Sequence, residues 1–394
     1  MTKYNFLRLP LRLTSLQAIV SCVSTKFRLG LVVSTTAVVW LLATTSTDAA
    51  LLWNDDETPV IPRDELPKKL SIKKIPLGFD KPPASPTDNP TTVEKAQLGR
   101  RLFFDPVLST DGTVSCASCH QPDHGFASPS AVSIGIGSQK GTRNAPTILN
   151  RGYGDNFSWD GRDATLEAQA LGVLQSKTEL GGDTDKVVAN IKKDDQYVAA
   201  FAAVFSEPGK KAQGKAQGKT QGEAAKQFVT LENITKAIAC FERTLTSGNS
   251  QVDRFRNDEY DALSKEARQG LWIFESRGGC WKCHNGSNLA DDEFHNTGVG
   301  YGKKDRDLGR AEATQNAQHN FQFKTPTLRE IEHTAPYMHD GSVKTLKEVV
   351  EFYNKGGAPD DPTIDEDMKP LNLTEEEVGF LVEFLKAMSS PEVK

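Results

Sequence analysis

Two short motifs in the sequence combine thiols and an imidazole at a fixed spacing. CASCH occupies residues 116–120, and CWKCH occupies residues 280–284. In each motif two cysteines flank two other residues, and a histidine follows the second cysteine directly. Two thiols at this spacing can add across the two vinyl groups of a haem, and the adjacent histidine can then ligate the iron. The sequence therefore predicts two covalently bound c-type haems.

This interpretation gives a role to every cysteine and histidine of the two motifs. It assigns haem attachment to Cys116, Cys119, Cys280 and Cys283, and iron ligation to His120 and His284. A CxxC pair alone would also suit zinc, a redox-active dithiol or a disulfide. Zinc would require the two motifs to pool ligands across a long stretch of chain, and it leaves both histidines without a role. Two haems are therefore the stronger prediction.

Helices must position these motifs, and the same helix pattern precedes each one. Alanine, glycine and phenylalanine recur at equal spacing, as Ala96, Gly99 and Phe103 and again as Ala267, Gly270 and Phe274. Such a repeat predicts two related helical units. Strand-like runs are scarce. The expected fold is mainly α, with two cytochrome c-like helical haem domains, long loops and an internal duplication.

Composition sets the expected domain boundaries. Residues 91–247 and 248–394 are expected to form the N-terminal and C-terminal haem domains. Residues 51–90 are rich in Pro, Lys and Asp, which predicts an extended arm. Gly, Gln and Lys recur in residues 209–226, which predicts a solvated low-complexity insertion. Cys240 lies on a predicted amphipathic helix and is expected to be a buried small hydrophobe.

The N-terminus has the pattern of an export signal. Basic residues precede an apolar run at 29–45, and small residues suited to cleavage follow near Ala49 and Ala50. Residues 1–50 are therefore expected to be a signal peptide, with an uncleaved membrane anchor as the alternative. Either way the folded part is expected in the periplasm. The net charge of −5 argues against a general nucleic-acid binder.

From about Lys95 to the C-terminus the chain resembles the bacterial di-haem cytochrome c peroxidase and MauG family. The stretches that carry the resemblance are RRLFFDPVLS, CASCH, KGTRNAPTILN, FSWDGR, AIACFERTL, CWKCH, FKTPTLREIEHTAPYMHDGS and TLKEVVEFYNKGG. They occur in the order found in the family and cover about three quarters of the chain. The resemblance implies a peroxidatic N-terminal haem and an electron-transfer C-terminal haem.

The resemblance also suggests which iron is open. Typical peroxidases of the family place a blocking histidine about twenty residues after the first CxxCH, and Ile136 stands at that position here. His124 is only four residues after His120 and is expected to contact a loop or a haem propionate. The N-terminal haem is therefore expected to be five-coordinate at rest, as in MauG-like members.

For the C-terminal haem, the family's distal ligand is a methionine in most peroxidases and a tyrosine in MauG-like members. Tyr353, in VEFYNKGG, occupies the corresponding position. A phenolate is a hard, anionic ligand that stabilises ferric iron, whereas methionine raises the reduction potential. Met338 and Met368 remain the alternative ligands.

The remaining site residues are implied by the resemblance alone. Glu179 matches the catalytic glutamate and Gln169 the distal-pocket amide, and Trp159 matches the tryptophan between the haems. The family's calcium ligands match the Asn144 side chain and the carbonyls of Thr334 and Pro336, and oxygen ligands suit Ca²⁺. His339 is expected to brace the surroundings of the second haem.

Three functions are compatible with these residues. The first is reduction of hydrogen peroxide to water, with a small cytochrome c or copper protein as electron donor. The second is a MauG-type oxidation of aromatic residues on a partner protein, which matures the cofactor of that partner. The third is plain electron transfer, which predicts no open iron and no role for Glu179. Many members of the family dimerise, so a homodimer is compatible with the resemblance.

Overall fold

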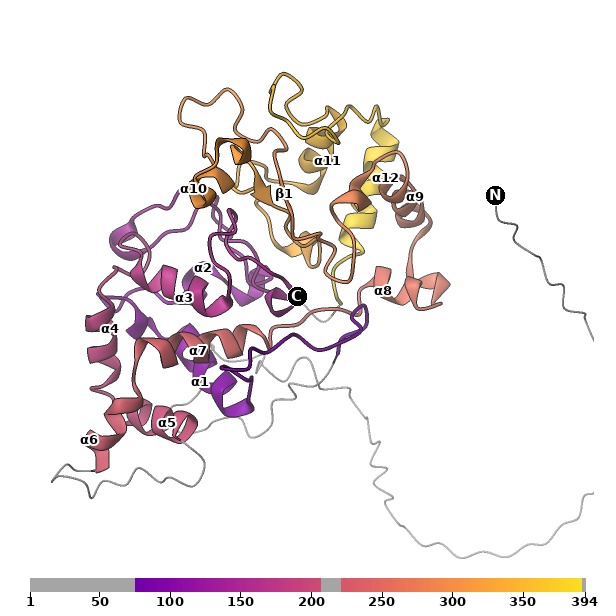
Figure 1. Ribbon diagram of the computed structural model, residues 1–394. Coiled ribbons are helices and arrows are strands. Elements are labelled where there is room, and N and C mark those ends of the chain that lie inside the picture. Colours follow the sequence, from indigo (N-terminus) through magenta and orange to yellow (C-terminus); the bar gives the residue numbers. More distant parts are fainter. Residues whose placement is uncertain (1–74, 207–220, 392–394) are drawn as a thin grey trace, which may run out of the picture. The chain divides into compact units, whose positions relative to one another are not determined.

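Helices make up most of the regular structure, as the sequence predicts. The computed structural model describes residues 75–206 and 221–391, drawn in colour in Figure 1. The α-helices and strands are α1 (Val93–Phe104), α2 (Cys116–Cys119), α3 (Leu166–Gln175), α4 (Thr184–Ile191), α5 (Asp195–Phe205), α6 (Gln221–Ala225), α7 (Leu231–Glu242), α8 (Gln251–Arg256), α9 (Lys265–Glu275), β1 (Phe294–His295), α10 (Arg310–Thr314), β2 (Phe323–Lys324), α11 (Leu346–Asn354) and α12 (Glu375–Lys386).

In the N-terminal half, α1 crosses α7 at very short range. Thr92 caps α1 by accepting the backbone N–H of Lys95 at 3.2 Å. A Cβ added to Gly99 would lie 1.8 Å from the carbonyl oxygen of Ala237 on α7, so only glycine allows the two helices to approach this closely. Phe103 and Phe241 then pack with ring centroids 5.2 Å apart.

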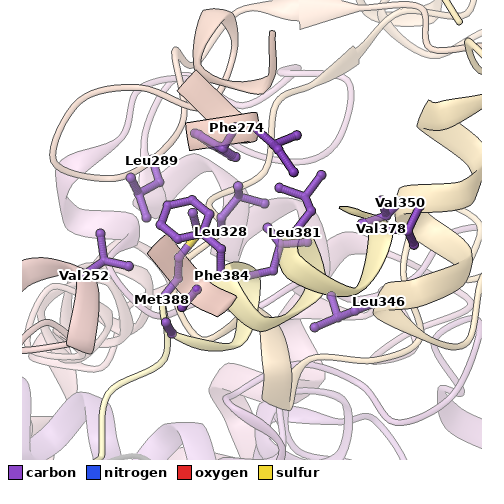
Figure 2. Close-up of a cluster of buried hydrophobic side chains, with 14 of the residues drawn as sticks. Val252, Phe274, Leu289, Leu328, Leu346, Val350, Val378, Leu381, Phe384 and Met388 are labelled. Carbon is purple, nitrogen blue, oxygen red and sulfur yellow. The ribbon is translucent and has the colours of Figure 1, made fainter. Parts of the chain in front are cut away.

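The C-terminal half repeats this crossing with α9 and α12, which lie side by side in Figure 1. A Cβ on Gly270 would lie 2.1 Å from the carbonyl oxygen of Phe380. The rings of Phe274 and Phe384 are again 5.2 Å apart. Figure 2 shows both rings inside the buried cluster, with Leu381 beside them. The duplication that the sequence predicts is therefore present as two equivalent helix crossings.

A second pair of equivalent segments lies, in each half, between the two helices that cross. A bridged turn, with 157 paired to 163 in one half and 337 paired to 343 in the other, precedes a capped helix. Thr165 caps α3 and Thr345 caps α11, each by accepting a backbone N–H three residues further on. Because the two turns and caps match, residues at equal distances from Thr165 and Thr345 occupy equivalent positions.

The two halves are linked by hydrogen bonds and ion pairs. Arg143 of the N-terminal half binds Asp307 of the C-terminal half through two hydrogen bonds of 2.7 and 2.8 Å. Strands β1 and β2 form a short antiparallel pair, and the backbone N–H of Lys324 on β2 donates to the carbonyl of Trp159 at 2.8 Å. These contacts hold loops of one half against the other.

Several segments singled out in the sequence fall partly or wholly outside the described residues. These include the expected signal or anchor at 1–50, most of the arm at 51–90, and residues 209–220 of the insertion. The described end of the insertion forms the short helix α6. The described part of the arm contains no helix or strand before α1, and Phe79 stacks on Tyr153 at 4.0 Å. Within 75–206 and 221–391, no helix has the length and apolarity needed to cross a bilayer.

Candidate functional site: two cavities at the CxxCH motifs

Each CxxCH motif forms one tight helical turn that brings its histidine under the first cysteine. The N–H of His120 donates to the carbonyl of Cys116 at 3.0 Å, and the N–H of His284 donates to the carbonyl of Cys280 at 2.9 Å. In the described part of the chain, the cysteines of both motifs form no disulfide. The disulfide alternative is therefore wrong for the four motif cysteines.

Both histidines are oriented in the same way. Nδ1 of His120 lies 3.1 Å from the carbonyl oxygen of Phe126, and Nδ1 of His284 lies 3.1 Å from that of Leu289. A ring that donates from Nδ1 has its lone pair on Nε2, which is the arrangement of a metal-ligating imidazole. Burial lowers the pKa of both rings, which favours the neutral, ligating form.

A cavity opens beside each motif. The first cavity is lined by Cys116, Cys119 and His120, and the second by Cys280, Cys283 and His284. Two thiols and an oriented imidazole on one wall of each cavity match the donor set that attaches and ligates a c-type haem.

The first cavity brings together the catalytic residues predicted for the N-terminal haem. Glu179, Gln169 and Trp159 all line it together with His120. Arg162, the last residue of FSWDGR, lines it as well, although no role was predicted for this arginine. Burial raises the pKa of Glu179, while the charge of Arg162 and a hydrogen bond from Ser176 act in the opposite direction.

The loop that carries Glu179 is fixed by backbone hydrogen bonds. The N–H of Ile136 donates to the carbonyl of Glu179 at 3.0 Å, and the N–H of Thr110 donates to the carbonyl of Leu180 at 2.9 Å. Ile136 is not among the residues that line the first cavity, but its neighbour Gly135 is. The segment around Ile136 therefore supports the loop that carries Glu179.

The repeat itself shows how the two cavities differ. Val173 lies eight residues after Thr165 on α3 and lines the first cavity, whereas Tyr353 lies eight residues after Thr345 on α11 and lines the second. A valine has no atom that can bind iron, whereas a phenol oxygen can. The equivalent positions thus offer a possible ligand in the second cavity and none in the first.

The comparisons with known proteins agree with this geometry. The family model for di-haem cytochrome c peroxidase matches residues 93–261. The chain is 35% identical to cytochrome-c peroxidase IdrP1 of Denitromonas iodatirespirans, over 80% of this chain and 87% of that protein. It is 34% identical to the methylamine utilization protein MauG of Methylorubrum extorquens, over 77% and 81% of the two chains. The chain belongs to the di-haem cytochrome c peroxidase family.

Solved structures give the same assignment. A MauG-like protein associated with microbial copper homeostasis superposes with a TM-score of 0.69 at 30% identity, and the match covers 87% of this chain and 99% of that one. The di-haem peroxidase BthA from Burkholderia thailandensis has a TM-score of 0.65 at 22% identity, covers 77% and 88% of the two chains, and supports the fold alone. Membership of the family implies two c-type haems, and the two cavities of this chain fit them.

In this family member the second cavity contains more than one candidate ligand. Tyr353, Met338 and Met368 all line it. Burial raises the pKa of Tyr353 to about 12. Tyr353 is the only one of the three whose ligand atom is a phenol oxygen, and the two methionines offer a thioether sulfur instead.

Trp159 lines both cavities and thus lies between the two haem sites of the family member. Its Nε1–H donates to the carbonyl of Asn144 at 2.9 Å. His339 also lines both cavities, and its ring centroid is 6.5 Å from that of Trp159. His339 also stacks on Phe323, with ring centroids 3.5 Å apart, and Phe323 lines the second cavity as well.

The predicted calcium ligands lie where the loop at residues 334–339 of the C-terminal half meets Asn144 of the N-terminal half. Asn144, Thr334 and Pro336 all line the second cavity. The side-chain amide of Asn144 donates to the carbonyl of Ser130 at 2.9 Å, which leaves Oδ1 available as an acceptor. His124 hydrogen-bonds to the carbonyl of Ala335 in the same loop, so it contacts a loop as the sequence predicts.

Another group of possible metal ligands lies beside the second motif. Cys283, Asp291 and His295 have ligand atoms within 4.8 Å of one another. Attachment of Cys283 to a haem removes its thiolate from this group. The ring of His295 is then held by Asp291 at 3.1 Å and by Asp365 at 2.8 Å. This arrangement gives His295, which had no assignable role in the sequence, a structural one.

Proposed function

We propose that this protein is a di-haem peroxidase that reduces hydrogen peroxide at its N-terminal haem. The observation that carries this proposal is the contrast between Val173 and Tyr353 at equivalent positions. The first cavity has no ligand at this position and contains Glu179 and Gln169 in its wall, whereas the second has a phenol. Substrate can therefore reach one iron, and the other serves electron transfer.

A c-type haem, when bound, supplies the redox chemistry that cleaves the peroxide O–O bond. The residues of this chain supply proton transfer and orientation. Glu179 accepts the proton of the peroxide oxygen nearest the iron and returns it to the departing oxygen, which leaves as water. Burial raises the pKa of this carboxyl above that of an exposed glutamate, so it can both accept and release a proton.

Two further residues shape the first cavity. Gln169 lies on α3, one turn before Val173, and its side chain can donate to and accept from the substrate. Arg162 faces Glu179 closely enough to offset part of the effect of burial on its pKa. Its positive charge favours the ionised form of Glu179.

Complete turnover takes up two protons and two electrons for each peroxide and forms two waters. We propose that electrons enter near the second cavity and cross beside Trp159, which lines both cavities. A small cytochrome c or a copper protein is the proposed donor. We also propose that a calcium ion held by Asn144, Thr334 and Pro336 fixes the loop at residues 334–339 against the N-terminal half. We further propose that the protein works in the periplasm.

A direct test mixes the purified diferric protein with hydrogen peroxide, with and without reduced cytochrome c. Rapid oxidation of the donor that depends on peroxide is the expected result. A resting spectrum in which both irons are fully low-spin, together with no spectral response to peroxide, would leave only electron transfer.

A second candidate function is MauG-type oxidation of aromatic residues on a partner protein. The similarity to MauG itself and to a MauG-like protein favours it, as does a tyrosine rather than a methionine at position 353. In the same experiment, this function predicts a long-lived spectral change with peroxide and little turnover of the donor.

A further inference from the structure

Helices α7 and α12, the second helix of each crossing, each line one cavity with two side chains four residues apart. Ile238 and Glu242 of α7 line the first cavity. Leu381 and Leu385 of α12 line the second cavity. Side chains four residues apart lie on the same face of a helix, so one face of each helix is turned toward its cavity.

The repeat makes these two helix faces directly comparable. Phe241 of α7 and Phe384 of α12 make the equivalent ring contacts of the two crossings, each with centroids 5.2 Å apart. Glu242 directly follows Phe241, and Leu385 directly follows Phe384, so these two residues are also equivalent. The first cavity therefore has a carboxyl group at the position where the second cavity has an aliphatic side chain.

Glu242 is buried without the partners that normally stabilise a buried carboxylate. The residue is only 5% exposed, and its Oε2 has no hydrogen-bond partner among the described residues. In the same part of the chain, no lysine or arginine nitrogen lies within 4.0 Å of its carboxyl oxygens. An unpaired carboxylate is costly to bury, and such a group is easily neutralised by a proton.

The charged groups around Glu242 come from three other segments and from its own helix. Arg243 follows it on the chain and donates to Glu167 of α3 at 3.0 Å. Arg151 lines the same cavity, and the thiol of Cys116, on α2, becomes a neutral thioether when a haem is attached. Burial raises the pKa of Glu242 to about 8, and Glu167 acts in the same direction, whereas Arg243 and Arg151 act against it. The carboxyl can therefore change its charge near neutral pH.

We propose that Glu242 is the proton-linked group of the N-terminal haem: its carboxyl takes up one proton when that iron accepts an electron, and releases the proton when the iron is oxidised. The electron comes from the donor and the proton from water. A carboxylate stabilises ferric iron, which carries more positive charge than ferrous iron, so protonation and reduction favour each other. The proposal rests on the haem of the first cavity and adds proton storage to the proposed function, since reduction of peroxide also consumes protons. The equivalent residue of the second cavity, Leu385, cannot take this role.

The experiment measures the midpoint potential of the N-terminal haem by spectroelectrochemistry in the full-length, haem-loaded protein across the neutral pH range. The potential should fall as pH rises, by at most ~59 mV per pH unit, which is a tenfold change in the equilibrium constant of a one-electron couple. Glu242→Gln and Glu242→Leu should both remove this dependence and keep the potential near its low-pH value. Glu232→Gln is the matched control and should retain the dependence, because Glu232 is an exposed carboxylate on the same helix, paired with Lys236.

Glu179 also lines the first cavity and provides the competing assignment, although it is less buried than Glu242. A pH dependence that persists in both Glu242 variants overturns the proposal, and its loss in Glu179→Gln would assign the proton to Glu179. A potential that does not change with pH in the original protein overturns the proposal without any variant.

Infrared spectroscopy gives a second readout of the same proton. The reduced-minus-oxidised difference spectrum should contain the band of a protonated carboxyl in the original protein and in Glu232→Gln. The band should be absent from Glu242→Gln, and an unchanged band contradicts the proposal. Because neither measurement uses peroxide, a protein that fails to reduce peroxide can still show the proton linkage, so the two proposals fail separately.

Discussion

Replacing Glu179 with glutamine separates proton transfer from every other property of the first cavity. The side chains have nearly the same shape, but the amide cannot accept the peroxide proton at neutral pH. The loop should keep its conformation, because it is fixed through the backbone carbonyls of Glu179 and Leu180. The change therefore removes one chemical group and leaves the cavity, the haem attachment and the axial histidine intact.

The expected loss follows from what a positioned acid–base group contributes. General acid–base catalysis accelerates a step by roughly 10²–10⁴-fold. This corresponds to about 2.7–5.5 kcal/mol of activation free energy. Glu179 lies in the wall of the same cavity as His120, so its whole contribution falls on the reaction of peroxide with the enzyme. The second-order rate constant should fall by that factor, and the resting spectrum should be unchanged.

Stopped-flow mixing with peroxide measures this rate constant across a range of pH. Because a base must be deprotonated to act, the rate constant should rise with pH through the pKa of Glu179. Burial raises that pKa above the ordinary glutamate value, so the rise should occur at a higher pH than for an exposed carboxylate. Glu179→Gln should lose the rise. Lys177→Gln is the control, because Lys177 is exposed on the same loop and does not line the cavity.

A Glu179→Gln variant with less than a tenfold loss and an unchanged pH profile would refute the assignment of Glu179 as the proton carrier. Equal losses in Glu179→Gln and Lys177→Gln would instead point to a disturbed loop, and would equally contradict the stated role.

Four further outcomes are expected. Tyr353→Met should raise the potential of the C-terminal haem in a redox titration, because a thioether stabilises ferric iron less than a phenolate does; an unchanged potential excludes Tyr353 as the ligand. Trp159→Phe should slow electron transfer between the haems, followed by stopped-flow, without slowing the initial reaction with peroxide. Gly270→Ala should destabilise the protein by about 1–3 kcal/mol in denaturant unfolding, because its Cβ would meet the backbone of α12. Gly379→Ala has open space around it and should stabilise the protein by about 0.5–1 kcal/mol in the same measurement. Prolonged chelation should reduce peroxide turnover, and added Ca²⁺ should restore it in the original protein but not in an Asn144→Ala variant. Activity that survives verified removal of calcium, or that any divalent ion restores equally well, speaks against the calcium site.

The sequence was sufficient for the parts of this protein that depend on local spacing. A CxxCH motif must close one helical turn to bring its histidine under the thiols, so the haem attachment could be predicted from five consecutive residues. The repeated pattern of Ala, Gly and Phe likewise predicted two equivalent helices, because only glycine permits the close crossing seen at Gly99 and Gly270.

Other features depend on which distant segments share a cavity. Arg162 lies in the FSWDGR stretch and Val173 on α3, but only the structure shows that both line the cavity of the first CxxCH motif. A signal for Val173 was present in the repeat, since it lies at the same distance from Thr165 as Tyr353 does from Thr345. Using that signal required knowing that both threonines cap equivalent helices.

By itself, the sequence determined the two haem attachments, the mainly helical duplicated fold and the residues that resemble catalytic ones. Only the tertiary structure decided that Glu179 and Gln169 face the cavity of His120 and that Trp159 lies between two cavities. The physical reason is how far apart along the sequence the interacting residues lie. Helix caps and CxxCH turns are set by neighbours along the chain, whereas a cavity wall brings together residues from separate segments, as it does with His120 and Glu179.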